Sequence, residues 1–126
     1  MPFVDHRTIP EVLMRSGVRG KFLVNKDTPS RNVTLLMNEV DPGASIPLHQ
    51  HSVEETVYML EGEIWARIGN DRYTVTAHDS VLFPAGVPHA WGNAGAGVAR
   101  MLWIFSGPDP FADSIYLEGR PPIERA

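Results

Sequence analysis

Residues 43–62 read GASIPLHQHSVEETVYMLEG, a segment that holds two histidines and a glutamate close together, His49, His51 and Glu55. A strand presents residues i and i+2 on one face, so His49 and His51 point the same way, roughly 6.6 Å apart along the strand. If the chain stayed extended, Glu55 would lie about 13 Å beyond His51. Residues 52–54 must therefore bend the chain back, so that Glu55 begins the next strand.

A third histidine follows in the segment PAGVPH, residues 84–89. Neutral imidazole and carboxylate are ligands that bind first-row divalent metals. We therefore expect His49, His51, Glu55 and His89 to form one metal site. An isolated His-x-His pair would be a weak indication by itself, since a lone histidine is more often a packed or solvated residue.

The spacing of these residues resembles the two sequence motifs of the cupin superfamily. The first motif is matched at every fixed position, by Gly43, His49, His51, Glu55 and Gly62. The second motif is matched by Pro84, Gly86, His89 and Asn93. One position departs, because His78 stands where the second motif has a glycine, which leaves only the tightness of that turn in doubt. Together the motifs cover residues 43–93.

The resemblance implies an all-β fold, the double-stranded β-helix or jelly-roll barrel of a small single-domain cupin. A chain of 126 residues is the size of one domain. We expect one domain over 1–126, with a barrel core at about 21–105, an amino-terminal arm at 1–20 and a carboxy-terminal tail at 106–126. The prolines of the tail predict that it wraps the outside of the barrel or a partner subunit.

Eleven glycines and eleven prolines interrupt the chain too often for long helices. A helix-like start is predicted over 8–16, where Thr8 and Glu11 have capping-box spacing and Pro10 and Gly17 limit the length. Elsewhere the pattern predicts short strands at 21–24, 33–40, 46–51, 55–60, 63–68, 72–76, 80–83, 87–91 and 98–105. Residues 69–71, Gly-Asn-Asp, are typical of a hairpin turn.

Period-2 alternation places some side chains in the barrel interior. In the strand that Glu55 begins, Val57 and Met59 should share the ligand side. The predicted pocket residues are Met59, Phe83, Trp91 and Trp103. For each of these residues, simple core packing is the alternative interpretation.

Composition limits the partners that we expect. The net charge of −4 shows no basic surface, so nucleic acid or an anionic membrane is not expected to bind. The absence of cysteine excludes disulfides and zinc–thiolate sites. No apolar run is long enough to cross a bilayer, and we expect a cytoplasmic protein with a small-molecule substrate.

Small cupins pair as homodimers, and the resemblance implies the same here. An uncovered edge at the predicted strand 21–24 would support such pairing. His6 and His78 have no role in the motifs, and we expect both at the surface or in turns.

The predicted ligand set leaves two positions of an octahedral ion open. We expect one divalent transition metal, with Fe, Mn, Ni, Cu and Zn all compatible with these ligands. The first hypothesis is an enzyme of dioxygenase type, acting on an aromatic, enol or dicarbonyl substrate, with Glu55 as a catalytic proton acceptor. The second is a redox-neutral isomerase, lyase or cyclase with a sugar- or polyketide-type substrate. The third is a non-catalytic ligand-binding cupin.

Overall fold

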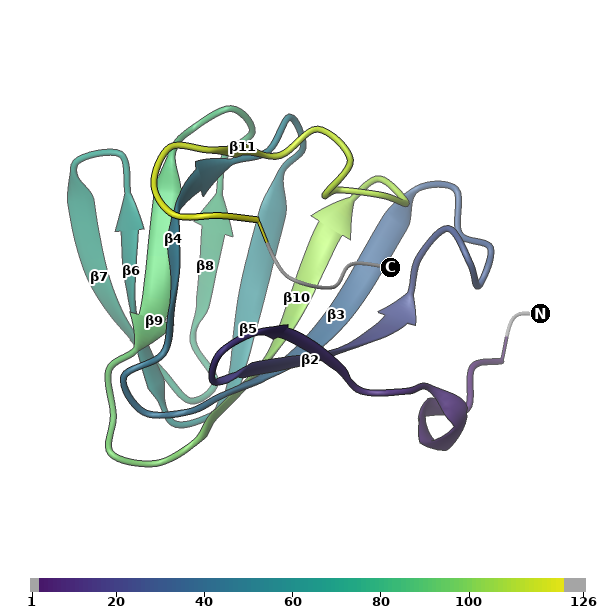
Figure 1. Ribbon diagram of the computed structural model, residues 1–126, viewed down its shortest axis with the longest axis horizontal. Helices are drawn as coiled ribbons and strands as arrows, with labels where there is room; N and C mark the ends of the chain where they lie inside the picture. Colours follow the sequence, from purple (N-terminus) through teal and green to yellow (C-terminus); the bar gives the residue numbers. More distant parts are fainter. Residues whose placement is uncertain (1–2, 122–126) are drawn as a thin grey trace.

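Two antiparallel sheets face each other in the computed structural model, which describes residues 3–121 (Figure 1). The six-stranded sheet has the order β1-β2-β3-β10-β5-β8 and the five-stranded sheet the order β11-β4-β9-β6-β7. The first sheet consists of β1 Val12–Arg15, β2 Val18–Val24, β3 Val33–Val40, β10 Ala99–Ser106, β5 Glu55–Glu61 and β8 Ser80–Phe83. The second consists of β11 Ile115–Tyr116, β4 Ser45–Gln50, β9 His89–Asn93, β6 Glu63–Ile68 and β7 Asp71–Thr76. The predicted all-β fold is confirmed, as two antiparallel sheets that pack face to face.

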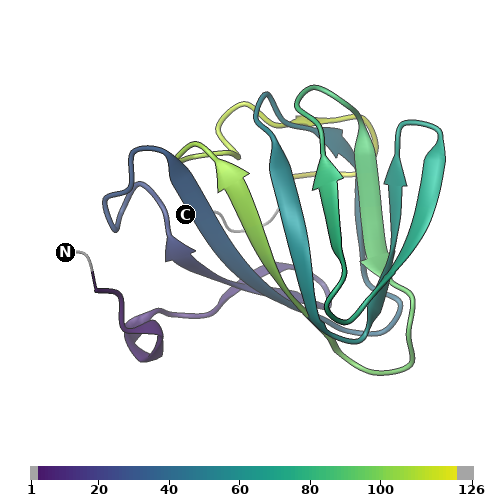
Figure 2. The same ribbon diagram turned by 180° about the vertical axis from the view of Figure 1, so that it is seen from behind.

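Alternating side chains build the core between the sheets. In β5, Val57 and Met59 are fully buried, whereas Tyr58 between them is exposed. Strands β3 and β10 alternate in the same way and pair along their whole length, from Ala99 opposite Val40 to Ser106 opposite Val33. Figure 2 shows from behind that β3, β10, β5 and β8 of the six-stranded sheet lie side by side. The inward residues of both sheets close over a single hydrophobic cluster.

The helix predicted over 8–16 is wrong. A short 3-10 helix, η1 His6–Thr8, is followed by strand β1, which forms a hairpin with β2. Met14 is buried and its neighbour Leu13 is exposed, so the period is that of a strand. Gly17 turns the hairpin with φ +76°, and a Cβ there would lie 2.7 Å from the Cβ of Ala44. The capping-box spacing was outweighed by this turn and by pairing with β2.

Strand β2 begins at Val18, earlier than the predicted strand 21–24, and it is not an edge. It lies between β1 and β3, so the segment 1–20, which we expected to be an arm, contributes β1 and the start of β2 to the sheet. The exposed edge beside it is β1. Among residues 3–121, no helix has the length and apolar character needed to cross a membrane.

The predicted bend between the first two ligand-bearing strands is confirmed. β4 ends at Gln50 and β5 begins at Glu55. The backbone N–H of Gly86 donates to the carbonyl of His51 at 2.8 Å. This hydrogen bond ties the bend to the loop that precedes His89, so the two motifs meet at one end of the barrel.

Candidate metal centre

The structure brings His49, His51, Glu55 and His89 together at this end of the barrel. One ligand atom from each residue lies within 4.8 Å of all the others. His49 on β4 is directly opposite His89 on β9, and Glu55 is the first residue of β5. All four side chains are buried, with exposed fractions of 2–4%. The sequence spacing therefore predicted which side chains meet.

Each imidazole is oriented by a backbone carbonyl. The Nδ1 atoms of His49, His51 and His89 lie 2.7, 3.0 and 3.2 Å from the carbonyl oxygens of Pro47, Pro110 and Val87. These contacts assign the proton to Nδ1, so that Nδ1–H donates to the carbonyl. The unprotonated Nε2 atoms are then available as ligands. Such orienting contacts are typical of metal-binding histidines.

The atoms at the centre of the cluster fit a cation. Glu55 Oε1 lies 2.6 Å from His89 Nε2 and 3.7 Å from His51 Nε2. Among the described residues, Glu55 Oε1 and His89 Nε2 are buried atoms without a hydrogen-bond partner. With His89 neutral, two lone pairs would face each other, and a cation between them removes the repulsion. Imidazole nitrogens and a carboxylate oxygen form a donor set suited to a divalent transition metal.

Burial favours the neutral, metal-binding form of His49 and His51. Desolvation, helped by neighbouring His89, lowers the pKa of His49 to about 3. Desolvation also lowers the pKa of His51, although the Glu55 carboxylate opposes the shift. Protons therefore compete weakly for these nitrogens near neutral pH.

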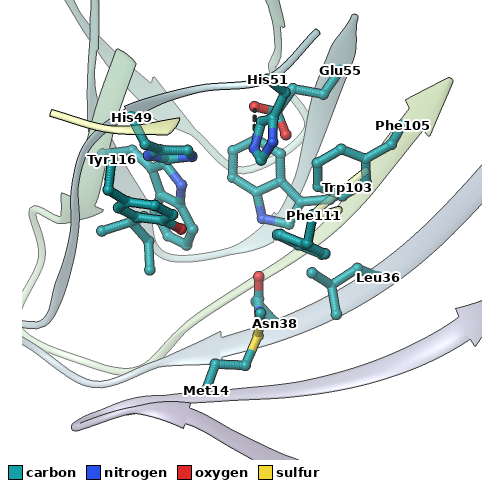
Figure 3. A pocket seen from close by; sticks show the side chains of 12 residues that line it. Met14, Leu36, Asn38, His49, His51, Glu55, Trp103, Phe105, Phe111 and Tyr116 are labelled. Carbon is teal, nitrogen blue, oxygen red and sulfur yellow. Dashed lines mark hydrogen bonds and ion pairs between the residues drawn. The ribbon is translucent and has the colours of Figure 1, made fainter. Parts of the chain in front are cut away.

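An apolar cavity lies beside the cluster (Figure 3). Its empty space is about 350 Å³ including the part open to solvent, but the room for the centres of water molecules is only about 30 Å³. Trp91 and Trp103 line it, as the sequence predicts. Met59 and Phe83 are fully buried in the core and are not among its lining residues. Phe83 instead packs against His89, with ring centroids 4.7 Å apart.

Sequence reasoning missed several lining residues. These are Met14, Leu36, Asn38, Ile46, Phe105, Phe111 and Tyr116. Leu36 and Asn38 could have been found, because they occupy the buried positions of an alternating strand. Phe111 and Tyr116 carried no such signal, since they lie in the irregular tail.

The described part of the tail lies against its own barrel, which is the first of the two placements that the sequence predicts for it. Strand β11 pairs with β4, placing Tyr116 opposite His49. The rings of Tyr116 and His49 stack with centroids 4.8 Å apart and an interplanar angle of 12°. The ring of Phe111 lies 5.6 Å from that of His51. Figure 1 shows this segment, in yellow, running from β10 of one sheet to β4 of the other.

Comparisons with known proteins agree with this architecture. Over 81 residues the chain is 31% identical to the HTH-type transcriptional regulator PuuR of Escherichia coli, a match that covers 64% of this chain and 44% of the regulator. The chain thus corresponds to less than half of that relative's length.

Two solved structures share the fold. The polyketide cyclase RemF of Streptomyces resistomycificus has a TM-score of 0.80 and 19% identity, covering 95% of this chain and 87% of RemF. The oxalate decarboxylase of Bacillus subtilis, which has Mn(II) centres, has a TM-score of 0.78 and 24% identity over 91% of this chain and 32% of its own. Residues 36–105 match the family described as the cupin domain. The chain belongs to the cupin family.

Proposed function

We propose that this protein is a metal-dependent enzyme that acts on a small oxygenated substrate, with chemistry of the dioxygenase type. The observation that carries the proposal is a buried set of three histidines and one glutamate opening onto an apolar, aromatic cavity. An aromatic, enol or dicarbonyl compound combines an apolar body with oxygen atoms that can reach a metal. A sugar would call for a more polar wall.

His49, His51, Glu55 and His89 would hold the metal. A divalent ion there supplies a Lewis acid and, if it is iron, manganese, nickel or copper, a redox partner for dioxygen. Similarity to a manganese-containing decarboxylase supports manganese as one candidate beside iron.

The side chains of this protein supply position and proton transfer. Trp91, Trp103 and Phe105 would hold the apolar part of the substrate and keep water out. Glu55 is the one carboxylate among the lining residues. The Glu55 carboxylate oxygen that does not bind the metal would therefore accept a substrate proton, which makes Glu55 a catalytic residue as well as a ligand.

The small free volume sets a further requirement. The space open to the centres of water molecules, about 30 Å³, is enough for roughly two of them. A ring-sized substrate must therefore displace a wall of the cavity. The carboxy-terminal segment is the wall with the shortest strand, the two residues of β11, although it also bonds to Leu48 and to His51.

An oxygen electrode tests the proposal. Iron-reconstituted protein should consume oxygen in the presence of a catechol, β-diketone or hydroxyketone from a graded panel. Oxygen uptake should vanish in Glu55→Ala. It should persist in His78→Ala, because His78 is exposed and is not one of the four clustered residues. No substrate-dependent uptake across the panel would contradict the dioxygenase assignment.

A redox-neutral lyase, isomerase or cyclase is the second candidate. Similarity to the polyketide cyclase RemF supports it, because that match extends over nearly the whole of both chains. Turnover of an enol or polyketide substrate under strict anaerobiosis would favour this class. Ligand binding without turnover would favour a non-catalytic module, which the PuuR match supports.

We also propose a homodimer, on the family resemblance and on the edge strand β1, where Leu13 is 49% exposed. Light scattering should give twice the chain mass of 14.0 kDa. A mass of one chain at micromolar concentration would contradict it.

A further inference from the structure

Two polar atoms stand out in the apolar wall of the cavity. The indole Nε1 of Trp103 is buried and has no hydrogen-bond partner among residues 3–121. Asn38 also lines the cavity, with only 2% of its surface exposed. A buried indole N–H ordinarily has an acceptor, and leaving it unpaired is unfavourable.

The orientation of the Asn38 amide is set by its surroundings. Its Nδ2 donates to the backbone carbonyl of Arg19 at 2.9 Å and lies 3.3 Å from Met14 Sδ. Turning the amide over would place Oδ1 against the Arg19 carbonyl, two acceptors in contact. The amide therefore directs Oδ1 away from Arg19, and Figure 3 shows the oxygen pointing into the cavity.

Trp103 and Asn38 are neighbours on the same face of the sheet. Trp103 on β10 pairs with Leu36 on β3, and Asn38 is two residues further along β3. Such diagonal neighbours lie about 7–8 Å apart, within reach of a shared small group. In Figure 3, Asn38 lies at the end of the cavity away from His51 and Glu55.

We infer that Trp103 Nε1 and Asn38 Oδ1 form a second polar subsite, which takes a neutral hydroxyl group at the end of the substrate remote from the metal ligands. The inference rests on the proposed function only in placing the other end of the substrate at the metal. It names the substrate class as a metal-binding head, a short apolar body and a terminal hydroxyl.

The chemistry of the subsite excludes charged ends. A hydroxyl can accept from the indole N–H and donate to the amide oxygen at the same time. A carboxylate would face the amide oxygen with no proton to donate, and an ammonium could not accept from the indole. The residues that line the cavity include no lysine, arginine or aspartate to compensate such a charge.

The test measures binding to the zinc-loaded protein, without dioxygen and without turnover. The probes are a graded series of ω-hydroxyalkanoates, each paired with the alkanoate in which a methyl group replaces the hydroxyl. At the chain length that spans the cavity, calorimetry should show the hydroxyalkanoate binding roughly tenfold more tightly than its partner. Trp103→Phe, which removes the N–H and keeps an aromatic ring, should abolish this preference.

Trp91→Phe is the matched control. Trp91 lines the same cavity, but its nitrogen is not among the buried atoms without a partner. Its replacement should therefore change both affinities alike and leave their ratio, the preference for the hydroxyl, as it was. A measurement on the unmutated protein guards against misfolding of the variants. The indole N–H resonance of Trp103, identified by its loss in Trp103→Phe, should shift with the hydroxyalkanoate and stay in place with the alkanoate.

Equal affinities at every chain length, no binding by any probe, or a preference that survives in Trp103→Phe would each overturn the subsite. An unmoved indole resonance would show that an ordered water alone occupies it, and would overturn it as well. The binding test uses zinc in place of iron and excludes oxygen, so its outcome does not depend on dioxygenase activity. The subsite can therefore be tested even if the dioxygenase proposal fails.

Discussion

The strands that carry the metal-ligand histidines and the carboxy-terminal segment border the same cavity, yet they are held in different ways. β4 and β9 are interior strands of the five-stranded sheet, and the ligands His49 and His89 pair directly across them. The carboxy-terminal segment contributes only the two-residue edge strand β11, and separate hydrogen bonds hold the rest of it, such as those of the Leu117 N–H with the Leu48 carbonyl and of the Pro110 carbonyl with His51. The first arrangement holds its ligands by continuous strand pairing, whereas the second covers the site and orients His51 through a series of separate contacts.

Removing one of the four metal-ligand side chains should have the largest effect. Replacing His49, His51, Glu55 or His89 by Ala should lower metal affinity by more than about a hundredfold, since losing an orienting contact alone costs about 10–100-fold. Elemental analysis of protein purified without chelator should find about one metal ion per chain before the change and a small fraction afterwards.

The controls for this prediction are the two histidines outside the cluster. His6 and His78 are both exposed, as predicted, and their replacement by Ala should leave the metal content unchanged. Equal loss from His78→Ala would contradict the assignment of the ligands.

Low pH should destabilise the metal-free protein through its buried ligand histidines. The pKa of His49 falls to about 3 in the folded protein, below its ordinary value of 6.5, and the pKa of His51 is also lowered. Below pH 6.5 the unfolded chain therefore binds protons that the folded one does not. Metal-free protein should lose up to about 1.4 kcal/mol of stability per pH unit from His49 as the pH falls from 6.5 toward 3, and His51 should add to this loss just below pH 6.5.

Urea unfolding of the metal-free protein at successive pH values measures this slope. His49→Gln should reduce it, while His78→Gln should leave it unchanged. A stability that is flat between pH 6.5 and 4 would show that burial does not keep these imidazoles neutral.

Weakening the carboxy-terminal cover should have a smaller effect on stability and a visible effect on access. Tyr116→Ala removes the ring that stacks on His49 and lies 5.7 Å from the Arg15 guanidinium carbon. We expect a loss of about 1 kcal/mol and faster removal of the metal by a chelator, at an unchanged metal content per chain.

The matched control is Ile115→Ala, in the same short strand but 54% exposed. If both variants release metal at the unmutated rate, the segment does not limit access. If Tyr116→Ala loses its metal at equilibrium, the carboxy-terminal segment contributes to metal affinity. The proposed difference between this segment and the ligand-bearing strands would then be wrong.

The smallest effect concerns the turn before β8. His78 has φ +72° and is the one non-glycine residue with positive φ among residues 3–121, at the position where the second cupin motif has glycine. A left-handed conformation costs a side-chain-bearing residue about 1–2 kcal/mol, and glycine loses roughly 0.5–1 kcal/mol in entropy. His78→Gly should therefore stabilise the fold by up to about 1 kcal/mol relative to His78→Ala, which also lacks the Tyr58 contact.

Thermal unfolding of the two variants isolates the backbone term. Equal stability would show that this turn accepts a side chain without strain. The departure from the motif left the tightness of this turn open. The structure shows that His78 adopts a positive φ, the conformation that glycine adopts readily.

Local pattern predicted much of the site correctly. Spacing along a strand and a required bend were enough to bring Glu55 back toward His51, and alternation was enough to bury Val57 and Met59. It failed at 8–16, where a capping-box spacing indicated a helix and the chain forms the β1 hairpin. There the local preference was weak, and pairing with β2 decided the outcome.

The sequence by itself determined the ligand set and the fold class, because both can be recognised from local features, the residue spacing within each of the two cupin-like motifs and the alternation of the strands. Only the tertiary structure decided what covers the site and what lines it. Tyr116 meets His49, and Asn38 and Trp103 share one wall, through contacts between residues about 65 positions apart. Both contacts come from the pairing of strands that are distant in the sequence, β11 with β4 and β10 with β3, and the tail carries no periodic pattern that predicts its partner.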